Sequence, residues 1–266
     1  MRAKSAGYRS VLLTAVAASA LALSACTIPT ETAAGVTAAP TTTAGELVRS
    51  ATLQGKTVFL DPGHNGANDA GMSAPVPTGR GGTKECQTTG TSTDGGFPEH
   101  SLNWEVVAQM RTELENLGAR VLLSRADDTS VAPCVDRRAA DANASGADVV
   151  VAIHADGAAP DQHGFHVCFS APPLNAVQAG ASVAFAKSMR DALETSGLTP
   201  STYVGAGGLL PRGDLSGLNL SERPSILVEL GNMRNADEAR AMTSEEGRAR
   251  YAQAVVFGIV RYLDGR

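Results

Sequence analysis

The sequence predicts a single α/β domain with a twisted, mostly parallel sheet that is flanked by helices. Apolar, β-prone runs alternate with runs of helical period from about residue 56 to the C-terminus, and this alternation is typical of parallel sheets with helical connections. The chain has 266 residues, of which 43% are hydrophobic, so one large domain can bury a core. Aromatic residues are only 4% while Gly and Ala are abundant, which favours close packing of helices on the sheet.

Each element follows from its own local pattern. Continuous or alternating apolar runs predict strands at residues 56–60, 119–125, 147–156, 164–171 and 223–231. Helical spacing predicts helices at residues 99–118, 135–145, 179–197 and 244–263. In the first helix the apolar stripe consists of Leu102, Val106, Met110, Leu114 and Leu117, and Gly118 is a stop signal. Ser244 and Glu246 have the residue types of a cap and a first-turn acid for the last helix.

The N-terminus has the pattern of an export signal. A basic start is followed by the short apolar run at residues 11–23 and then by "LSAC", which ends at Cys26. This ending resembles a bacterial lipobox, in which the cysteine is acylated; the alternative is an ordinary signal peptide with an incidental Cys26. We therefore expect a signal peptide at residues 1–25, a Thr/Ala/Pro-rich tether at 26–53 and a catalytic domain at 54–266. The expected location is the cell envelope, either periplasmic or anchored to the membrane by lipid.

The net charge argues against polyanionic partners. The chain has a formal charge of −5, and loss of residues 1–25, which contain three basic residues and no acid, makes it −8. Such a protein has no electrostatic reason to bind nucleic acid. We also expect a monomer.

Four ionisable side chains mark a candidate site. His64, His154 and Glu229 each follow an apolar strand, and the carboxyl ends of parallel strands gather ligands. Glu99 opens the first long helix and is spaced so that it points along the apolar stripe. Taken singly, each has an ordinary interpretation as a turn residue, a helix-dipole acid or a paired buried carboxylate. Together they are two imidazoles and two carboxylates.

This set of side chains suits zinc. A catalytic zinc takes three protein ligands from His and Glu, and a remaining carboxylate can accept a proton from water. The implied chemistry is metal-assisted hydrolysis. The other histidines are weaker candidates, since His100 should point another way on the helix and the start of a strand explains His163 and His166 equally well.

Five separated segments resemble one family. "DPGHNG" at residues 61–66, Glu99, "RAADAN" at 138–143, "IHAD" at 153–156 and "VELGN" at 228–232 are similar to the zinc-dependent N-acetylmuramoyl-L-alanine amidases of the type-3 family. The resemblance implies that His64, Glu99 and His154 bind Zn²⁺ and that Glu229 is the catalytic acid/base. It implies a peptidoglycan or muropeptide substrate, cut between N-acetylmuramic acid and L-alanine. A zinc peptidase of the envelope would use the same atoms, and a non-catalytic peptidoglycan-binding domain would be expected to lack one of them.

Two further expectations concern the first motif and the cysteines. We expect Gly63 to let the chain turn sharply before His64, and Asp61 either to orient a ligand or to cap the turn. Export permits disulfides. Cys86 lies in a Gly/Thr-rich loop that leads to Glu99, and Cys134 lies in a turn just before a helix, whereas Cys168 has the pattern of a small core residue. We therefore pair Cys86 with Cys134 and leave Cys168 free.

Overall fold

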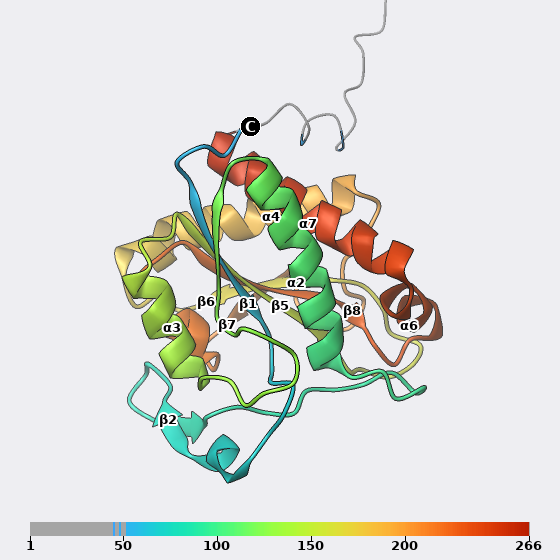
Figure 1. Cartoon of the computed structure of the whole chain (residues 1–266), viewed down its shortest axis with the longest axis horizontal. Coiled ribbons are helices and arrows are strands. Elements are labelled where there is room, and N and C mark those ends of the chain that lie inside the picture. Colours follow the sequence, from blue (N-terminus) through green and yellow to red (C-terminus); the bar gives the residue numbers. More distant parts are fainter. Residues whose placement is uncertain (1–44, 46–47, 49–51, 266) are drawn as a thin grey trace, which may run out of the picture. The chain divides into compact units, whose positions relative to one another are not determined.

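The computed structural model describes residues 45, 48 and 52–265. A six-stranded sheet forms the centre of the domain, in the order β4-β1-β5-β8-β6-β7 (Figure 1). Four strands are parallel to their neighbours, while β6 runs antiparallel to β8 and β7 runs parallel to β6. The predicted mostly parallel sheet is therefore confirmed. Its strands are β1 (Thr57–Pro62), β4 (Arg120–Leu123), β5 (Val149–Asp156), β6 (His166–Ser170), β7 (Leu209–Arg212) and β8 (Ser225–Asn232).

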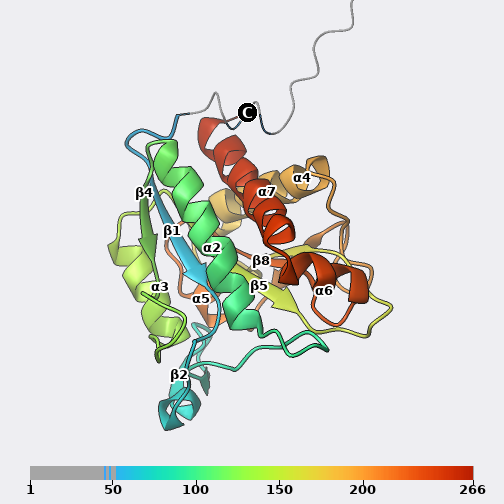
Figure 2. The ribbon, with the colours of Figure 1, turned by 45° about the vertical axis from the view of Figure 1, so that its right-hand side comes forward.

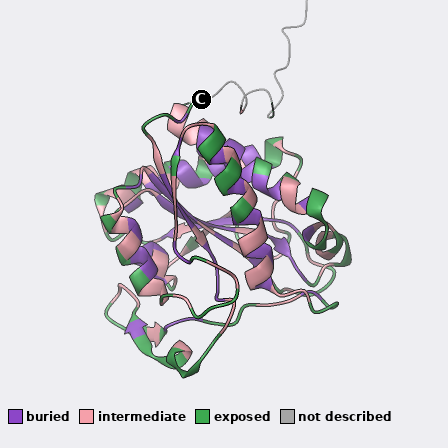
Figure 3. Cartoon of the chain, viewed as in Figure 1, coloured by how far each residue is buried: buried purple, intermediate pink, exposed green. Residues whose placement is uncertain are grey.

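Helices cover both faces of this sheet (Figure 2). Leu60, Val151 and Val228 point to one face, where they belong to a large core with the three long helices α2 (Glu99–Asn116), α4 (Val183–Thr195) and α7 (Glu245–Asp264). On the other face, Phe59 and Val150 pack with α3 (Val135–Ala144), and Leu227 packs with α5 (Ser216–Asn219). Because both faces of the sheet are buried, successive side chains along these strands are apolar, and the strands form continuous apolar runs in the sequence. Figure 3 shows the buried strands between partly exposed helices.

The helix signals in the sequence are confirmed. Leu102, Val106, Met110 and Leu114 are fully buried, so the predicted stripe of α2 is its core face. The helix ends at Asn116, and Gly118 follows with a φ of 91°. At α7 the Ser244 hydroxyl accepts a hydrogen bond from the Gly247 amide at 3.1 Å, which is the predicted cap.

Short elements were not predicted. β2 (Pro75–Pro77) and β3 (Thr83–Glu85) form a small antiparallel hairpin, and α5, α6 (Ala236–Thr243) and β7 lie in segments without a long apolar period. The helix expected at 179–197 is divided into a π-helical turn at Gln178–Ser182 and α4.

The predicted signal peptide, Cys26 and most of the tether lie outside the described residues. Within the described part of the chain, no helix has both the length and the apolar character that crossing a membrane requires.

Candidate metal centre and catalytic site

The structure brings the three predicted ligands together at one edge of the sheet. The Glu99 carboxylate lies between two imidazoles: its Oε2 is 3.0 Å from His64 Nε2, and its Oε1 is 3.0 Å from His154 Nδ1. One ligand atom from each residue lies within 4.8 Å of the others. This is the only group of three or more such side chains within metal-binding range among the residues that the structure describes.

A tight turn after β1 presents His64. His64 has a φ of 63°, the left-handed conformation that non-glycine residues rarely adopt. Arg138 at the start of α3 holds this turn, because its Nη2 donates to the His64 carbonyl at 2.8 Å and to Asn65 Oδ1 at 2.7 Å. The His64 Nδ1 donates to the Thr88 carbonyl at 2.7 Å. One proton is thereby placed on Nδ1, which leaves Nε2 as the nitrogen that could bind a metal ion.

Glu99 is held by backbone amides as well as by the histidines. Its Oε2 accepts from the Thr91 amide at 2.9 Å, and its Oε1 accepts from the Ala155 amide at 3.1 Å. Asn103, one turn further along α2, donates to Oε1 at 3.3 Å. Burial opposes ionisation of Glu99, but hydrogen bonds and charge from His154 and His64 outweigh it and lower its pKa. Burial likewise opposes protonation of His64, and Glu99 outweighs it and raises the pKa of His64.

Glu229 lies beside this group on β8. It is paired in register with His154 of β5, and residues paired across adjacent strands point to the same face. Its Oε2 is buried and has no hydrogen-bond partner within the described residues. Burial, followed by the charges of Glu99 and Asp156, raises the pKa of Glu229 well above its ordinary value of 4.5. A carboxyl group whose pKa is raised holds a proton more readily, which suits a group that accepts and returns protons.

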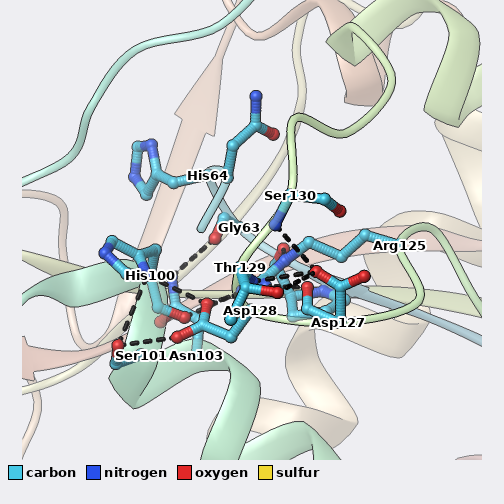
Figure 4. A network of polar contacts seen from close by, with 12 residues as sticks. Gly63, His64, His100, Ser101, Asn103, Arg125, Asp127, Asp128, Thr129 and Ser130 are labelled. Atoms are coloured by element: carbon cyan, nitrogen blue, oxygen red, sulfur yellow. Dashed lines mark hydrogen bonds and ion pairs between the residues drawn. The ribbon is translucent and has the colours of Figure 1, made fainter. Parts of the chain in front are cut away.

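The other histidines lie outside the cluster of His64, Glu99 and His154, the candidate metal group. His100 points away from it, as predicted, and its Nδ1 is 2.9 Å from Asp128 Oδ1. Figure 4 shows this neighbouring network, in which Arg125 donates to Asp128 Oδ1 at 2.8 Å and to the His100 carbonyl at 2.8 Å. The network joins the loop after β4 to the start of α2, which carries Glu99. His163 is exposed and His166 is buried in β6.

The loop between Cys86 and Glu99 packs directly on the metal group. It supplies the Thr88 carbonyl and the Thr91 amide described above. Gly90 lies so close that a Cβ there would fall 2.6 Å from Glu99 Oε2 and 2.7 Å from His64 Cδ2. The predicted Cys86–Cys134 disulfide is present and Cys168 is free and buried, so both expectations are confirmed.

Two details of the first motif were misjudged. Gly63 does not provide the unusual backbone conformation, which His64 itself adopts. Gly63 is required instead because a Cβ there would lie 2.2 Å from His154 Cε1. Asp61 does not cap the turn; its Oδ1 accepts from Arg138 Nη1 at 2.6 Å and from the Ser124 hydroxyl at 2.5 Å. Burial opposes ionisation of Asp61, but Arg138 outweighs it and lowers its pKa.

The residues present fit a zinc ion. Two imidazoles and one carboxylate are the donor set of hydrolytic zinc sites with an open fourth position. Each imidazole directs a nitrogen at the shared carboxylate, and hydrogen bonds behind His64 and Glu99 fix their orientation, as is usual for metal ligands.

Comparisons with known proteins place this fold in a family. Residues 58–261 match the family model described as N-acetylmuramoyl-L-alanine amidase. The chain is 54% identical over 213 residues to N-acetylmuramoyl-L-alanine amidase Rv3717 of Mycobacterium tuberculosis, covering 80% of this chain and 88% of the relative. The crystal structure of the amidase Ami1 from Mycobacterium smegmatis matches with a TM-score of 0.80 at 54% identity, over 81% of this chain and all of that one. Ami1 from Mycobacterium abscessus matches with a TM-score of 0.79 at 56% identity, over 79% of this chain and all of that one.

Proposed function

The chain belongs to the N-acetylmuramoyl-L-alanine amidase family of peptidoglycan hydrolases, and we propose that it works through one zinc ion held by His64, Glu99 and His154, with Glu229 as the catalytic acid/base. The observation that carries this proposal is the Glu99 carboxylate between two imidazole nitrogens, with Glu229 paired in register beside His154. A bound zinc ion supplies Lewis-acid activation of a water molecule and of the amide carbonyl.

The chain's own residues then account for orientation and proton transfer. Glu99 and His64 are held by the loop at residues 88–91, so the ligand atoms are fixed before substrate binds. Glu229 accepts the proton of the attacking water and returns it to the nitrogen of L-alanine as the amide bond breaks. The products are a lactyl carboxylate on the sugar and a peptide with a free amino terminus, so one molecule of water is consumed.

Two groups of variants test the proposed roles of Glu229 and of the metal ligands. Glu229→Gln should retain zinc and lose activity by roughly 100-fold or more, because proton transfer contributes on that scale. Glu222→Gln, an exposed glutamate outside the site, is the matched control.

His64→Ala and His154→Ala should lose most of the zinc by elemental analysis, whereas His163→Ala should not. Full zinc in both ligand variants would refute the ligand assignment.

Mass spectrometry of digested muropeptides tests the reaction itself. The wild type should release peptides that begin with L-alanine, and a chelator should stop their release until zinc is restored. A peptidase would instead leave alanine attached to the muramic acid. Loss of zinc from Glu229→Gln would make Glu229 a ligand, and near-normal activity would remove it from the mechanism.

A further inference from the structure

One asparagine lies on the buried face of α2, one turn beyond Glu99. Asn103 is 0% exposed, and the residues that follow it on this face, Val106, Val107 and Met110, are apolar and equally buried. Its Oδ1 is buried and has no hydrogen-bond partner in the part of the chain that the structure describes. Because an unpaired polar atom in a core lowers stability, packing alone favours a leucine of similar size at this position.

The other half of this side chain has two partners. Asn103 Nδ2 donates to Glu99 Oε1 at 3.3 Å and to the Gly63 carbonyl at 3.4 Å (Figure 4). Both partners are acceptors, so only the NH2 group of the amide can bind them. Both distances exceed the usual value of about 2.9–3.0 Å, so these two hydrogen bonds add little to stability.

Gly63 is the backbone unit at which two of the candidate ligands meet. It directly precedes His64, and a Cβ on it would lie 2.2 Å from His154 Cε1, so its backbone lies against the His154 ring. Its amide donates to the carbonyl of Ile153, the residue before His154, at 3.0 Å. The hydrogen bond from Asn103 to the Gly63 carbonyl therefore ties α2 to the turn that lies against both imidazole-bearing residues.

The other backbone contacts of Glu99 lead to different elements. The Thr91 amide joins Glu99 to the loop before α2, and the Ala155 amide joins it to β5. Asn103 joins Glu99 to the turn after β1, because the same Nδ2 binds both Glu99 and Gly63. The three candidate ligands come from the turn after β1, from α2 and from β5, so their relative positions depend on contacts of this kind.

We propose that Asn103 is a positioning residue of the metal site, which fixes the Glu99 carboxylate relative to the turn that carries His64. This proposal rests on the proposed zinc site. Asn103 acts through Glu99 and Gly63 and does not itself bind the metal. Without its NH2 group, Glu99 Oε1 loses one of the donors that orient it, and α2 loses its tie to the turn. Groups that orient metal ligands commonly contribute about 10- to 100-fold to metal affinity.

Zinc affinity and thermal stability separate this role from ordinary packing. Asn103→Leu should bind zinc at least about tenfold more weakly in competition with a chelator, because leucine fills the same space without a donor. Its metal-free Tm should change little. The control is Val107→Ala, one turn further along the same buried face of α2. It should lower the Tm, because it leaves a cavity in the core, and it should keep the zinc affinity of the wild type.

Cobalt substituted for zinc gives a second readout, since its visible absorption depends on the arrangement of the ligand atoms. The absorption bands should shift in Asn103→Leu and coincide with those of the wild type in Val107→Ala. Unchanged zinc affinity in Asn103→Leu, or an equal loss in both variants, would overturn the positioning role. A wild type that binds no zinc, or a His64→Ala variant that binds it normally, would instead refute the proposed metal site.

Discussion

At the scale of single residues, the site depends on close contacts that limit what each position can hold. His64 keeps its left-handed backbone because Arg138 binds the carbonyl of His64 and the side chain of Asn65. Such a conformation costs of order 1 kcal/mol or more and persists where neighbouring groups enforce it. The buried Arg138 therefore supports the proposed metal site through the backbone of His64.

Gly63→Ala should damage the metal site more than the fold. The added methyl would lie 2.2 Å from the His154 ring, which must move away from Glu99. We expect zinc affinity to fall at least about tenfold, equivalent to ~1.4 kcal/mol. Elemental analysis measures the zinc content, and circular dichroism measures whether the fold is kept. Gly82→Ala is the control, since its methyl would meet only the Thr78 hydroxyl at 3.6 Å; equal zinc content in the two variants would contradict the steric argument.

Glu229→Gln should also change how the stability of the metal-free protein depends on pH. The pKa of Glu229 is raised in the folded state, so the native protein binds its proton more tightly than the unfolded chain does. Its contribution is fully present below the unfolded value of 4.5 and is lost as the pH rises toward the folded pKa. Glutamine does not ionise, so the Tm advantage of the variant should grow with pH above 4.5. Thermal unfolding at several pH values measures this, and a constant difference would contradict it.

The sequence predicted where His64, Glu99, His154 and Glu229 would meet better than it predicted the residues that hold them in place. His64, Glu99, His154 and Glu229 each stand at a strand end or a helix start, and those positions meet at one edge in a parallel sheet. Asn103 and Gly90 gave no comparable signal, because their roles depend on contacts with Glu99 that only the folded chain creates. The clue for Arg138 was its place in the "RAADAN" motif.

At the scale of elements, the loop from Cys86 to Glu99 packs against the proposed metal ligands. Its Thr88 carbonyl orients His64 and its Thr91 amide binds Glu99. The Cys86–Cys134 disulfide fixes the far end of this loop to the residue before α3, the helix that carries Arg138. We infer that the disulfide holds this loop in position against His64 and Glu99, in addition to stabilising the fold.

The double variant Cys86→Ser/Cys134→Ser separates these two roles. The cysteines are 48 residues apart, and a loop of that length corresponds to roughly 4 kcal/mol of stability at most. We expect a lower Tm and, in addition, weaker zinc binding at temperatures where the variant remains folded. The single variant Cys168→Ser is the control, since Cys168 is free. Unchanged zinc affinity in the double variant would leave the disulfide a purely structural role.

The elements that escaped prediction are short or irregular. β7 contains Pro211, which argues against a strand in a sequence pattern, yet β7 is the last strand of the sheet, and an edge strand tolerates a missing amide. The antiparallel direction of β6 also has no sequence signal. It follows from the connection after β5, and it places His166 next to Glu229. The long strands and helices were predictable because burial on one or both faces gives them a regular apolar pattern.

At the scale of the whole molecule, export and anchoring remain predictions that concern residues outside the described part of the chain. Without residues 1–25 the protein has a formal charge of −8, so an anionic membrane surface repels it. We therefore predict that stable membrane association depends on a lipid on Cys26. A high-salt wash should accordingly fail to release the wild type from membranes, because salt screens charges and leaves apolar contacts intact.

Cys26→Ser tests this anchoring directly. In a bacterial host, labelled palmitate should enter the wild type and not the variant, and the variant should move from the membrane fraction to the soluble fraction. Its activity on soluble muropeptides should change less than twofold, since Glu99, His64 and their supports all lie beyond residue 53. Cys168→Ser, which alters a buried free thiol, should remain in the membrane fraction. A mature N-terminus at any residue other than Cys26 would refute the lipoprotein interpretation.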